Sequence, residues 1–328
     1  MRPFAYDRAV SAQDAARAAA RHSAQFIAGG TTLLDLMKLD VMRPDQLVDI
    51  SGIGEDRIES TAQGLRLGGL VRMADAADHE EIRRDYPVVA QSLDLAASQQ
   101  LRNMARLGGN LLQRTRCPYF RDTSWADCNK RVPGSGCAAI QGVNRQHAVL
   151  GTSDACIATY PGDFAQALIA LDATIDVVGP DGARTMPVAE LHRLPDAQPH
   201  LETRLEPGEI ITAIEVPAGP WTRRSLYLKI RDRQSYAFAL ASAAVALDIA
   251  DGAVREARIA LGGVATVPWR ARAAEAALKG RPLDEPEAQE AAEAAFASAR
   301  PQRHNAFKID LGRRTLVRAL MQVARMEA

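Results

Sequence analysis

The segment that decides the fold opens as GGNLLQRTRCPYFRD (108–122) and continues through CNKRVPGSGC (128–137) to SDACIATYPGD (153–163). All the cysteines of the 328-residue chain lie in it, at Cys117, Cys128, Cys137 and Cys156. Ten, eight and eighteen residues separate successive cysteines. This is neither the paired C-x-x-C spacing of a zinc ribbon or thioredoxin site nor the compact run of a bacterial ferredoxin. Four thiols confined to one segment nevertheless indicate a shared role.

The residues around the cysteines favour a [4Fe–4S] cluster as that role. Pro118 fixes the turn after Cys117. Gly134 and Gly136 allow backbone N–H groups to turn towards sulfur, which helps to set a cluster potential. Basic residues nearby are expected to offset the negative charge of a thiolate-bound cluster, namely Arg114, Arg116, Arg121, Lys130 and Arg131. Structural zinc, two disulfides or unrelated buried thiols are the alternatives.

Length and composition narrow the class of protein. A chain of 328 residues has room for two domains. Its content of 47% hydrophobic and 24% charged residues is typical of a globular protein, and its net charge of zero argues against a nucleic-acid binder. The N-terminal residues 1–25 contain no long apolar stretch, so we expect no secretory signal, and no apolar run is long enough for a membrane span. Export in a folded complex, on a partner's signal, remains an alternative.

A second glycine motif, FIAGGTTLL (26–34), combines a short apolar strand, a turn and a helix start. Backbone N–H groups and two hydroxyls in such a turn can bind a phosphate, helped by the helix dipole. The alternative is a plain tight turn, because the motif is neither G-x-G-x-x-G nor a P-loop. The pair Gly108-Gly109 has the same two interpretations: close approach to a ligand, or the end of a helix.

The rest of the chain predicts a mixed α/β region followed by a smaller α+β domain. Ser11 with Asp14 indicates a helix start. Helices are expected at 11–21, 75–84, 87–103, 163–170, 271–278, 286–299 and 307–326, and strands at 47–50, 65–68, 174–178, 184–188, 210–216, 225–231, 237–249 and 254–264. The best linker candidate is 217–220. The scattered histidines, at 22, 79, 147, 192, 200 and 304, are expected on the surface or in loops, with His147 near the cluster as an alternative.

Four blocks of sequence taken together, 26–34, 108–111, 226–231 and 261–264, resemble the FAD-binding medium subunit of molybdenum hydroxylases. This is the xanthine dehydrogenase, carbon monoxide dehydrogenase and aldehyde oxidoreductase group. The resemblance covers nearly the whole chain. The cysteine segment resembles that of the bacterial periplasmic aldehyde oxidoreductases, in which the medium subunit carries an extra [4Fe–4S] cluster, and this implies that all four cysteines are ligands.

The resemblance implies a fold of the α+β class. Residues 1–220 would form a two-lobed FAD-binding domain of the vanillyl-alcohol oxidase type, with a cluster-binding insertion at about 114–156. Residues 221–328 would form a C-terminal domain with a three-stranded antiparallel sheet and a helical bundle.

The resemblance also implies a site for noncovalent FAD, with the pyrophosphate on residues 28–33. Tyr236 is expected over the isoalloxazine ring, as the catalytic residue. At position 107 the sequence departs from the family, where a threonine is frequent, so one hydroxyl contact to FAD is expected to be missing. The implied cofactor-binding set is Phe26, Ile27, Ala28, Gly29, Gly30, Thr31, Thr32, Leu33, Leu34, Leu107, Gly109, Asn110, Thr115, Asp163 and Lys229.

By the same resemblance, the chain would serve as an electron-transfer subunit in a heterotrimer or its dimer. A large subunit with the molybdenum cofactor would oxidise the aldehyde, and a small subunit with [2Fe–2S] centres would deliver electrons to this chain's FAD for an external acceptor. Two alternatives are a self-sufficient FAD oxidoreductase of the same fold and a zinc-braced scaffold subunit. The expected location is the periplasm if a partner carries the signal, and otherwise the cytoplasm.

Overall fold

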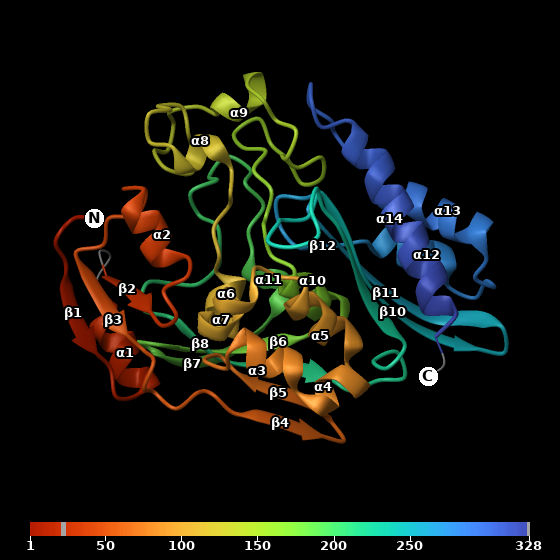
Figure 1. The fold of residues 1–328 in the computed structure, drawn as a ribbon, viewed down its shortest axis with the longest axis horizontal. Helices are drawn as coiled ribbons and strands as arrows, with labels where there is room; N and C mark the ends of the chain where they lie inside the picture. Colours follow the sequence, from red (N-terminus) through yellow and green to blue (C-terminus); the bar gives the residue numbers. More distant parts are fainter. Residues whose placement is uncertain (21–23, 327–328) are drawn as a thin grey trace.

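The chain begins with a small parallel sheet at one end of the molecule (Figure 1). The computed structural model describes residues 1–20 and 24–326, so Arg21 and His22 lie outside the described residues. The sheet has the order β1-β3-β2, and both strand pairs are parallel. Its elements are β1 (Ala5–Arg8), α1 (Ala12–Ala18), β2 (Ala24–Ile27), α2 (Leu33–Lys38) and β3 (Gln46–Asp49).

Helix α1 begins where the sequence predicts, because Ser11 caps it. The Ser11 hydroxyl accepts a bond from the Asp14 backbone N–H at 3.1 Å. We expect Ser11→Ala to lower the free energy of unfolding by about 1 kcal/mol, since one N–H group of the first turn loses its acceptor. Urea denaturation followed by circular dichroism measures this. Ser11→Gly is the control and should cost only a few tenths of that amount; equal losses in both variants would contradict the capping role.

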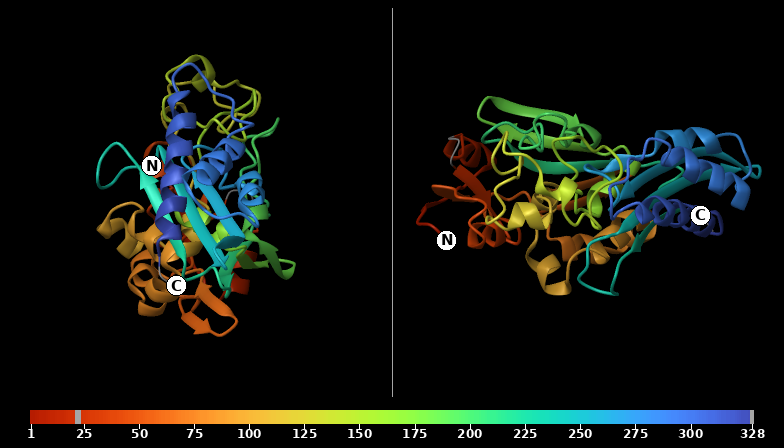
Figure 2. Two further views of the ribbon diagram at one scale, coloured as in Figure 1. Left: turned by 90° about the vertical axis from the view of Figure 1, so that its right-hand side faces the viewer. Right: turned by 90° about the horizontal axis from the view of Figure 1, so that it is seen from above.

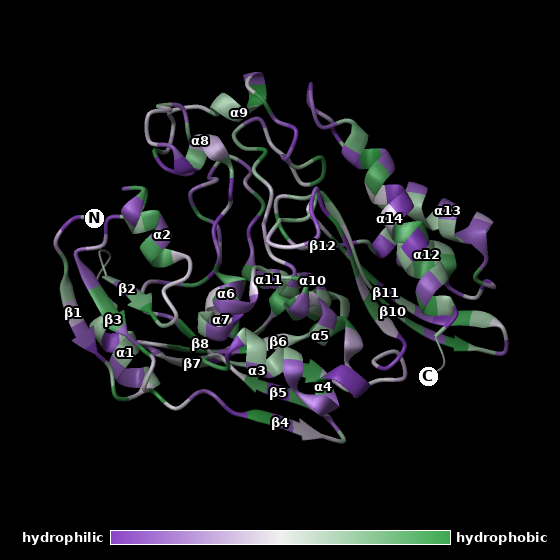
Figure 3. Ribbon diagram, in the orientation of Figure 1, coloured by the Kyte–Doolittle hydropathy of each residue, from purple (hydrophilic) through white to green (hydrophobic). Residues whose placement is uncertain are grey.

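The second lobe is built on an antiparallel sheet of order β4-β5-β8-β6-β7. Its strands are β4 (Ile58–Thr61), β5 (Gly64–Gly68), β6 (Thr174–Gly179), β7 (Gly182–Pro187) and β8 (Ile210–Pro217). Its helices are α3 (Met73–Asp78), α4 (Glu80–Asp85), α5 (Pro87–Asp94), α6 (Gln99–Met104), α7 (Leu107–Leu111), α10 (Phe164–Ala170) and α11 (Val188–Leu191). The hydropathy of these elements matches their positions in the lobe. The central strand β8 is apolar, whereas helix α4, on the outside, is mostly hydrophilic (Figure 3).

Two of the predicted helices are interrupted in the structure. The predicted helix 87–103 becomes α5 and α6, because Ala97 takes a left-handed φ of 49° and Ser98 caps a new helix at Leu101 N. The glycines at 108 and 109 lie inside α7 and do not end a helix, so that interpretation was wrong. The predicted helix 75–84 is likewise divided between α3 and α4.

The cysteine segment forms a loop-rich body above both lobes, with the short helices α8 (Pro118–Arg121) and α9 (Ala138–Gln141) (Figure 1). The C-terminal domain lies at the opposite end from the parallel sheet (Figure 2). Its elements are β9 (Ser225–Ile230), β10 (Ala241–Ala250), β11 (Ala253–Gly262), β12 (Trp269–Arg270), α12 (Arg272–Leu278), α13 (Glu285–Ala295) and α14 (Phe307–Ala324).

Strand β10 explains why the C-terminal domain is joined so closely to the second lobe. Side chains alternate along a strand, and in β10 the residues Ala243, Val245 and Leu247 face the C-terminal helices, whereas Ala244 and Ala246 pack in the core of the second lobe. The alanine-rich sequence therefore belongs to a strand buried on both faces.

The α+β class is confirmed, with two lobes of helices and sheets followed by a C-terminal domain that contains an antiparallel sheet. The antiparallel sheet has the order β12-β11-β10-β9 among the described residues, so the two-residue strand β12 extends the three predicted strands. The boundary at about 220 stays a prediction. Within 1–20 and 24–326, no helix combines the length and apolar character that crossing a membrane requires.

Candidate functional site

A cavity of about 1050 Å³ lies between the two lobes, the cysteine segment and the loop before β10. This volume is at the upper end of the roughly 300–1,000 Å³ typical of ligand sites. Of the predicted cofactor-binding residues, those that line it are Phe26, Ile27, Ala28, Gly29, Gly30, Thr31, Thr32, Leu33, Gly109, Asn110, Thr115 and Asp163. The structure thus brings together residues from three distant parts of the sequence.

The turn between β2 and α2 forms one wall of the cavity. A Cβ at Gly29 would lie 2.0 Å from the backbone oxygen of Met104, and Gly30 has a φ of +69°. Both positions therefore require glycine. Leu34 turns away from the cavity and packs over Gly30, and Leu107 is fully buried in the core of the second lobe. These two side chains do not line the cavity, because they complete the packing beneath its walls.

Three buried polar atoms of cavity-lining residues have no partner among the described residues: Oδ1 of Asn110, Nε of Arg106 and Nδ1 of His147. Asn110 donates to the sulfur of Met73, and Arg106 donates to the Leu70 carbonyl at 3.0 Å, so each side chain is held in place. A buried polar atom without a partner is costly unless a ligand satisfies it. These unpartnered atoms therefore indicate that the cavity binds a polar ligand.

Asp163 and Lys229 form a buried ion pair at the interface with the C-terminal domain. Lys229 Nζ lies 2.7 Å from Asp163 Oδ2, and the two side chains are 1% and 4% exposed. The ammonium also donates to the Leu95 carbonyl, and the Tyr227 hydroxyl donates to Asp163 Oδ1 at 2.7 Å. Asp163 lines the cavity, whereas Lys229 lies behind it and reaches the cavity only through its carboxylate partner.

Tyr236 lies at the mouth of the cavity, in the loop before β10. It is 58% exposed and has a φ of 52°. Arg233 lies 5.5 Å from its ring and donates to its carbonyl. A left-handed conformation is unfavourable for a bulky residue and is held here by these contacts. The predicted strand 237–249 begins only at Ala241, and residues 237–240 line the cavity instead.

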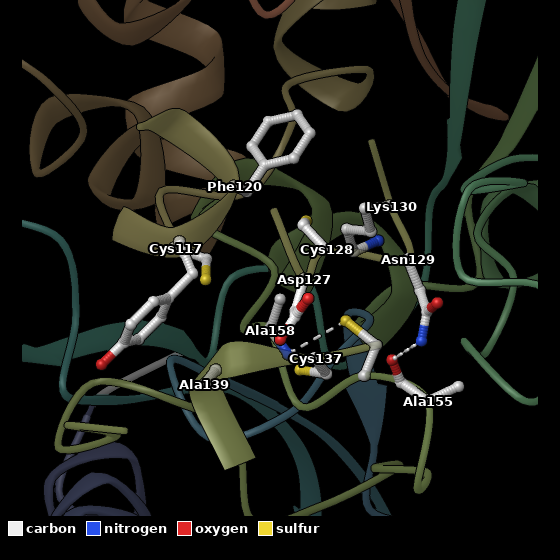
Figure 4. Close-up of a pocket in the computed structure, with 12 residues that line it drawn as sticks. Cys117, Phe120, Asp127, Cys128, Asn129, Lys130, Cys137, Ala139, Ala155 and Ala158 are labelled. Atoms are coloured by element: carbon white, nitrogen blue, oxygen red, sulfur yellow. Dashed lines mark hydrogen bonds between the residues drawn. The ribbon is translucent and has the colours of Figure 1, made fainter. Parts of the chain in front are cut away.

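The four cysteines surround one pocket beside this cavity (Figure 4). All are free thiols, so the structure holds no disulfide among them. Cys128 pairs with Cys137 across an isolated β-bridge. No group of three or more His, Cys, Asp or Glu side chains in the described ranges converges closely enough to hold a single metal ion.

A backbone N–H points at one of the sulfurs, since Ala158 N lies 3.4 Å from Cys156 Sγ. The backbone N–H group of Phe120 acts to lower the pKa of Cys117, and those of Ala139 and Ile140 act to lower that of Cys137. Gly136 does not donate its own N–H to sulfur, because this N–H binds Asn129 Oδ1 at 2.9 Å.

Burial and neighbouring thiols shift the pKa values of the cysteines in different directions. Burial raises the pKa of Cys117 to about 12. The bond from Cys156 lowers the pKa of Cys137 to about 6, and donating that bond raises the pKa of Cys156. Buried thiolates need a positive partner.

The nearby basic residues mostly serve other partners, which corrects the predicted charge compensation. Arg114 binds Glu202 and Arg121 binds Asp35, both at 2.7 Å, while Arg131 donates to backbone carbonyls. Only Lys130 among the five predicted cations lines the cysteine pocket, and it lies 3.6 Å from Glu202. A positive group that balances buried thiolates would therefore have to be bound within the pocket itself.

His147 lies inside the protein beside a cysteine, as the alternative expectation for this histidine had it, and not on the surface. It is 3% exposed, and its Nε2 lies 3.2 Å from Cys117 Sγ. Burial, and then the charge of Lys308, lower its pKa to about 4. His192 is also held inside the protein, where burial lowers its pKa to about 4 and its Nε2 lies 2.9 Å from the Leu111 carbonyl.

The cysteine pocket and the large cavity share a wall. Cys117 lines both, and His147 lines the large cavity beside it. A ligand in the cavity would thus lie against one of the four thiols.

Comparison with known proteins identifies the family. Residues 2–219 match the FAD binding domain in molybdopterin dehydrogenase, and residues 226–323 match the CO dehydrogenase flavoprotein C-terminal domain. The chain belongs to the family of FAD-binding medium subunits of molybdenum hydroxylases. The aldehyde oxidoreductase FAD-binding subunit PaoB of Escherichia coli is 50% identical over 331 residues, covering 100% of both chains.

More distant relatives of this FAD-binding subunit agree. The carbon monoxide dehydrogenase medium chain of Afipia carboxidovorans is 27% identical, covering 86% of this chain and 82% of the relative. The solved carbon monoxide dehydrogenase of Hydrogenophaga pseudoflava superimposes with a TM-score of 0.75 at 26% identity, covering 98% of this chain and 96% of that one. These relatives are subunits of oxidoreductase complexes.

Sequence reasoning missed several cavity residues of this FAD-binding subunit. Arg106 directly precedes the 107–109 block and could have been found from that position. Phe238, which lies 5.2 Å from the Arg116 guanidinium, carries no signal of its own, because only the folded loop brings it to the cavity.

The cavity wall at Gly29 gives a direct test. We expect Gly29→Ala to destabilise the chain by about 1–3 kcal/mol, because the added methyl meets backbone that cannot move aside, and to weaken FAD retention. The flavin absorbance per chain and chemical denaturation measure both effects. Gly52→Ala is the control, since a Cβ there meets no atom within 4 Å; an equal loss of FAD in both variants would contradict a specific role for the turn.

Proposed function

We propose that this chain is the FAD- and [4Fe–4S]-containing electron-transfer subunit of a molybdenum-dependent aldehyde oxidoreductase. Full-length identity of 50% to an aldehyde oxidoreductase FAD-binding subunit supports the substrate class. The observation that carries the electron-transfer role is the shared wall, since Cys117 lines both the cysteine pocket and the FAD-sized cavity. Two redox groups placed on either side of one residue are suited to exchange electrons.

The residues of the cavity fit FAD in a defined way. The pyrophosphate would lie on the turn at 28–33, where glycines leave the backbone N–H groups open. Asn110 and Arg106 would supply the polar contacts that their unpartnered atoms lack. Tyr236 and Phe238 would cover the isoalloxazine ring from the mouth of the cavity and exclude water. When bound, the flavin supplies chemistry that accepts electrons singly and delivers them in pairs, while the chain supplies position and electrostatics.

The donor set of the pocket fits a [4Fe–4S] cluster better than a zinc ion. Four thiolates around one zinc at about 2.3 Å would bring their sulfurs to about 3.8 Å from one another. The cysteines surround a common pocket without converging to that extent. A cubane gives each thiolate a different iron and so accepts a wider arrangement, and the N–H group aimed at the Cys156 sulfur is of the kind that tunes a cluster.

The proposed partners are a large subunit with the molybdenum cofactor and a small subunit with [2Fe–2S] centres. The chain would not act on the aldehyde itself. It would hold the FAD that passes electrons to an external acceptor, in a heterotrimer or a dimer of heterotrimers.

An anaerobic visible spectrum, with iron and acid-labile sulfide assayed on the same sample, tests this proposal. Flavin bands with about four irons and four sulfides per chain are expected. Zinc in a colourless sample would instead favour a zinc-braced scaffold. Turnover of an organic substrate by the isolated chain would favour a self-sufficient FAD oxidoreductase. Either result would overturn the proposed role.

A further inference from the structure

We propose that His147 is a positioning residue that donates its Nε2–H to the sulfur of Cys117, raises the reduction potential of the cluster, and is itself held in place by the start of helix α14. The inference rests on the proposed function, because it requires a cluster on the four cysteines. It assigns a task to a buried imidazole that is not one of the proposed ligands and that lines the large cavity beside Cys117.

The geometry of the imidazole selects one tautomer. Nε2 lies 3.2 Å from Cys117 Sγ, and the residue is 3% exposed. A neutral imidazole carries one ring proton. Nδ1 is buried and has no hydrogen-bond partner among the described residues in either tautomer, so only a proton on Nε2 can be donated to an acceptor, the sulfur of Cys117. A proton on Nε2 faces sulfur, and the thiolate of a cluster ligand is a better acceptor than a thiol.

The backbone of His147 is fixed from the C-terminal domain. Lys308 Nζ donates to the His147 carbonyl at 3.1 Å, and Asn305 Nδ2 donates to the same oxygen at 3.3 Å. Lys308 also donates to Gly263 at the end of β11, and both polar side chains are 0% exposed. The described contacts of Lys308 include no carboxylate. Its ammonium binds the backbone carbonyls of Gln146, His147 and Gly263, the last of which directly follows β11.

Residues before α14 fix the same segment through a second set of contacts. His147 N donates to the Asn144 carbonyl at 3.0 Å, and Asn144 Oδ1 accepts from His304 N at 2.9 Å. Asn144 Nδ2 donates to the Ala139 carbonyl in the helix that follows Cys137. The residues before α14 and in its first turn therefore hold the imidazole and the Cys137 helix in one polar network.

The effect of this hydrogen bond on the reduction potential follows from the charge that reduction adds. Reduction adds a negative charge to the cluster, and a donor to a ligand sulfur stabilises the reduced form more than the oxidised form. Because Cys117 is the ligand in the wall of the FAD cavity, the donor acts on the side of the cluster that faces the flavin.

Redox titration followed by electron paramagnetic resonance tests the inference on the whole chain. We expect His147→Leu to lower the ratio of reduced to oxidised cluster at a fixed potential about tenfold, which is a shift of 59 mV for one electron. His147→Gln keeps a donor nitrogen at this position and should stay near the wild type. The iron and sulfide content of each sample is the internal control. An unchanged cluster midpoint in His147→Leu, with full iron content, would overturn the inference.

A measurement on the unaltered protein covers the case in which the leucine variant loses its cluster. With ¹⁵N-labelled histidine, pulsed magnetic resonance of the reduced cluster should detect a coupled ¹⁵N nucleus that disappears in His147→Gln grown with the same label. A wild-type sample with a full cluster and no such coupling would refute the hydrogen bond. A wild-type sample without iron would instead refute the proposed function, so the two failures are distinguishable.

Discussion

Asp163→Asn is expected to lower the free energy of unfolding by about 3–5 kcal/mol, because it leaves the Lys229 ammonium buried without its counter-charge. An asparagine amide that faces Lys229 sets donor against donor, whereas in the other orientation the Tyr227 hydroxyl must accept from the amide and donate to Ser242 instead. Because Asp163 lines the cavity, FAD should be lost with the stability. Chemical denaturation of the flavin-free and flavin-loaded chain separates the two effects.

A matched double variant controls for this result. In Asp163→Asn/Lys229→Gln, the pair becomes neutral, and the glutamine can accept from the asparagine amide. We expect this variant to recover most of the lost stability, because replacing a whole buried pair costs far less than removing one partner. If the double variant is as unstable as Asp163→Asn, the loss comes from packing or cavity shape and not from an unpaired charge.

The contact between Asp163 and Lys229 could not be predicted from the sequence. Asp163 and Lys229 were each predicted to bind the cofactor through the family resemblance, yet 66 residues separate the two partners, and no local pattern indicates that they bind each other. The glycine turn at 26–34 and the four cysteines were recognisable because each motif is local and chemically distinctive. Ser11 was recognisable for the same reason.

The contact of His147 with Cys117 needed the fold. The place of His147 inside the cysteine segment made a position near the cluster an alternative, but the contact joins residues that are 30 positions apart and no spacing pattern predicts it. The break at Ala97 was also hidden, because alanine favours helix and only the folded chain shows its left-handed φ of 49°. Similarly, the basic residues near the cysteines could be counted in the sequence, but their acid partners at Asp35 and Glu202 could not be inferred.

The second large effect is expected from Cys128→Ser, which should abolish the iron and sulfide content while leaving flavin binding largely intact. Serine is a poor ligand at neutral pH because its hydroxyl stays protonated, whereas a cysteine bound to iron is a thiolate. Cys128 is buried in the pocket and does not line the FAD cavity, so the two cofactors should separate in this variant. Iron, sulfide and flavin assayed on one sample measure the outcome.

Ser135→Ala is the matched control for that variant. Its hydroxyl accepts from Cys128 N at 3.0 Å, so the alanine variant loosens the same loop without removing a sulfur. Iron should be retained. Equal iron loss in both variants would mean that the loop conformation, and not the sulfur of Cys128, holds the metal.

In an assembled complex that still holds FAD, the same Cys128→Ser variant tests whether the proposed cluster carries electrons to the flavin. If electrons reach the flavin through the cluster, flavin reduction by substrate should be slow in the variant and normal in Ser135→Ala. An unchanged rate would assign the cluster a bracing role, in which it fixes the insertion as the Lys308 and Asn305 contacts fix its far side. The shared wall at Cys117 favours the first outcome, because it places one of the four proposed cluster ligands at the cavity that FAD would fill.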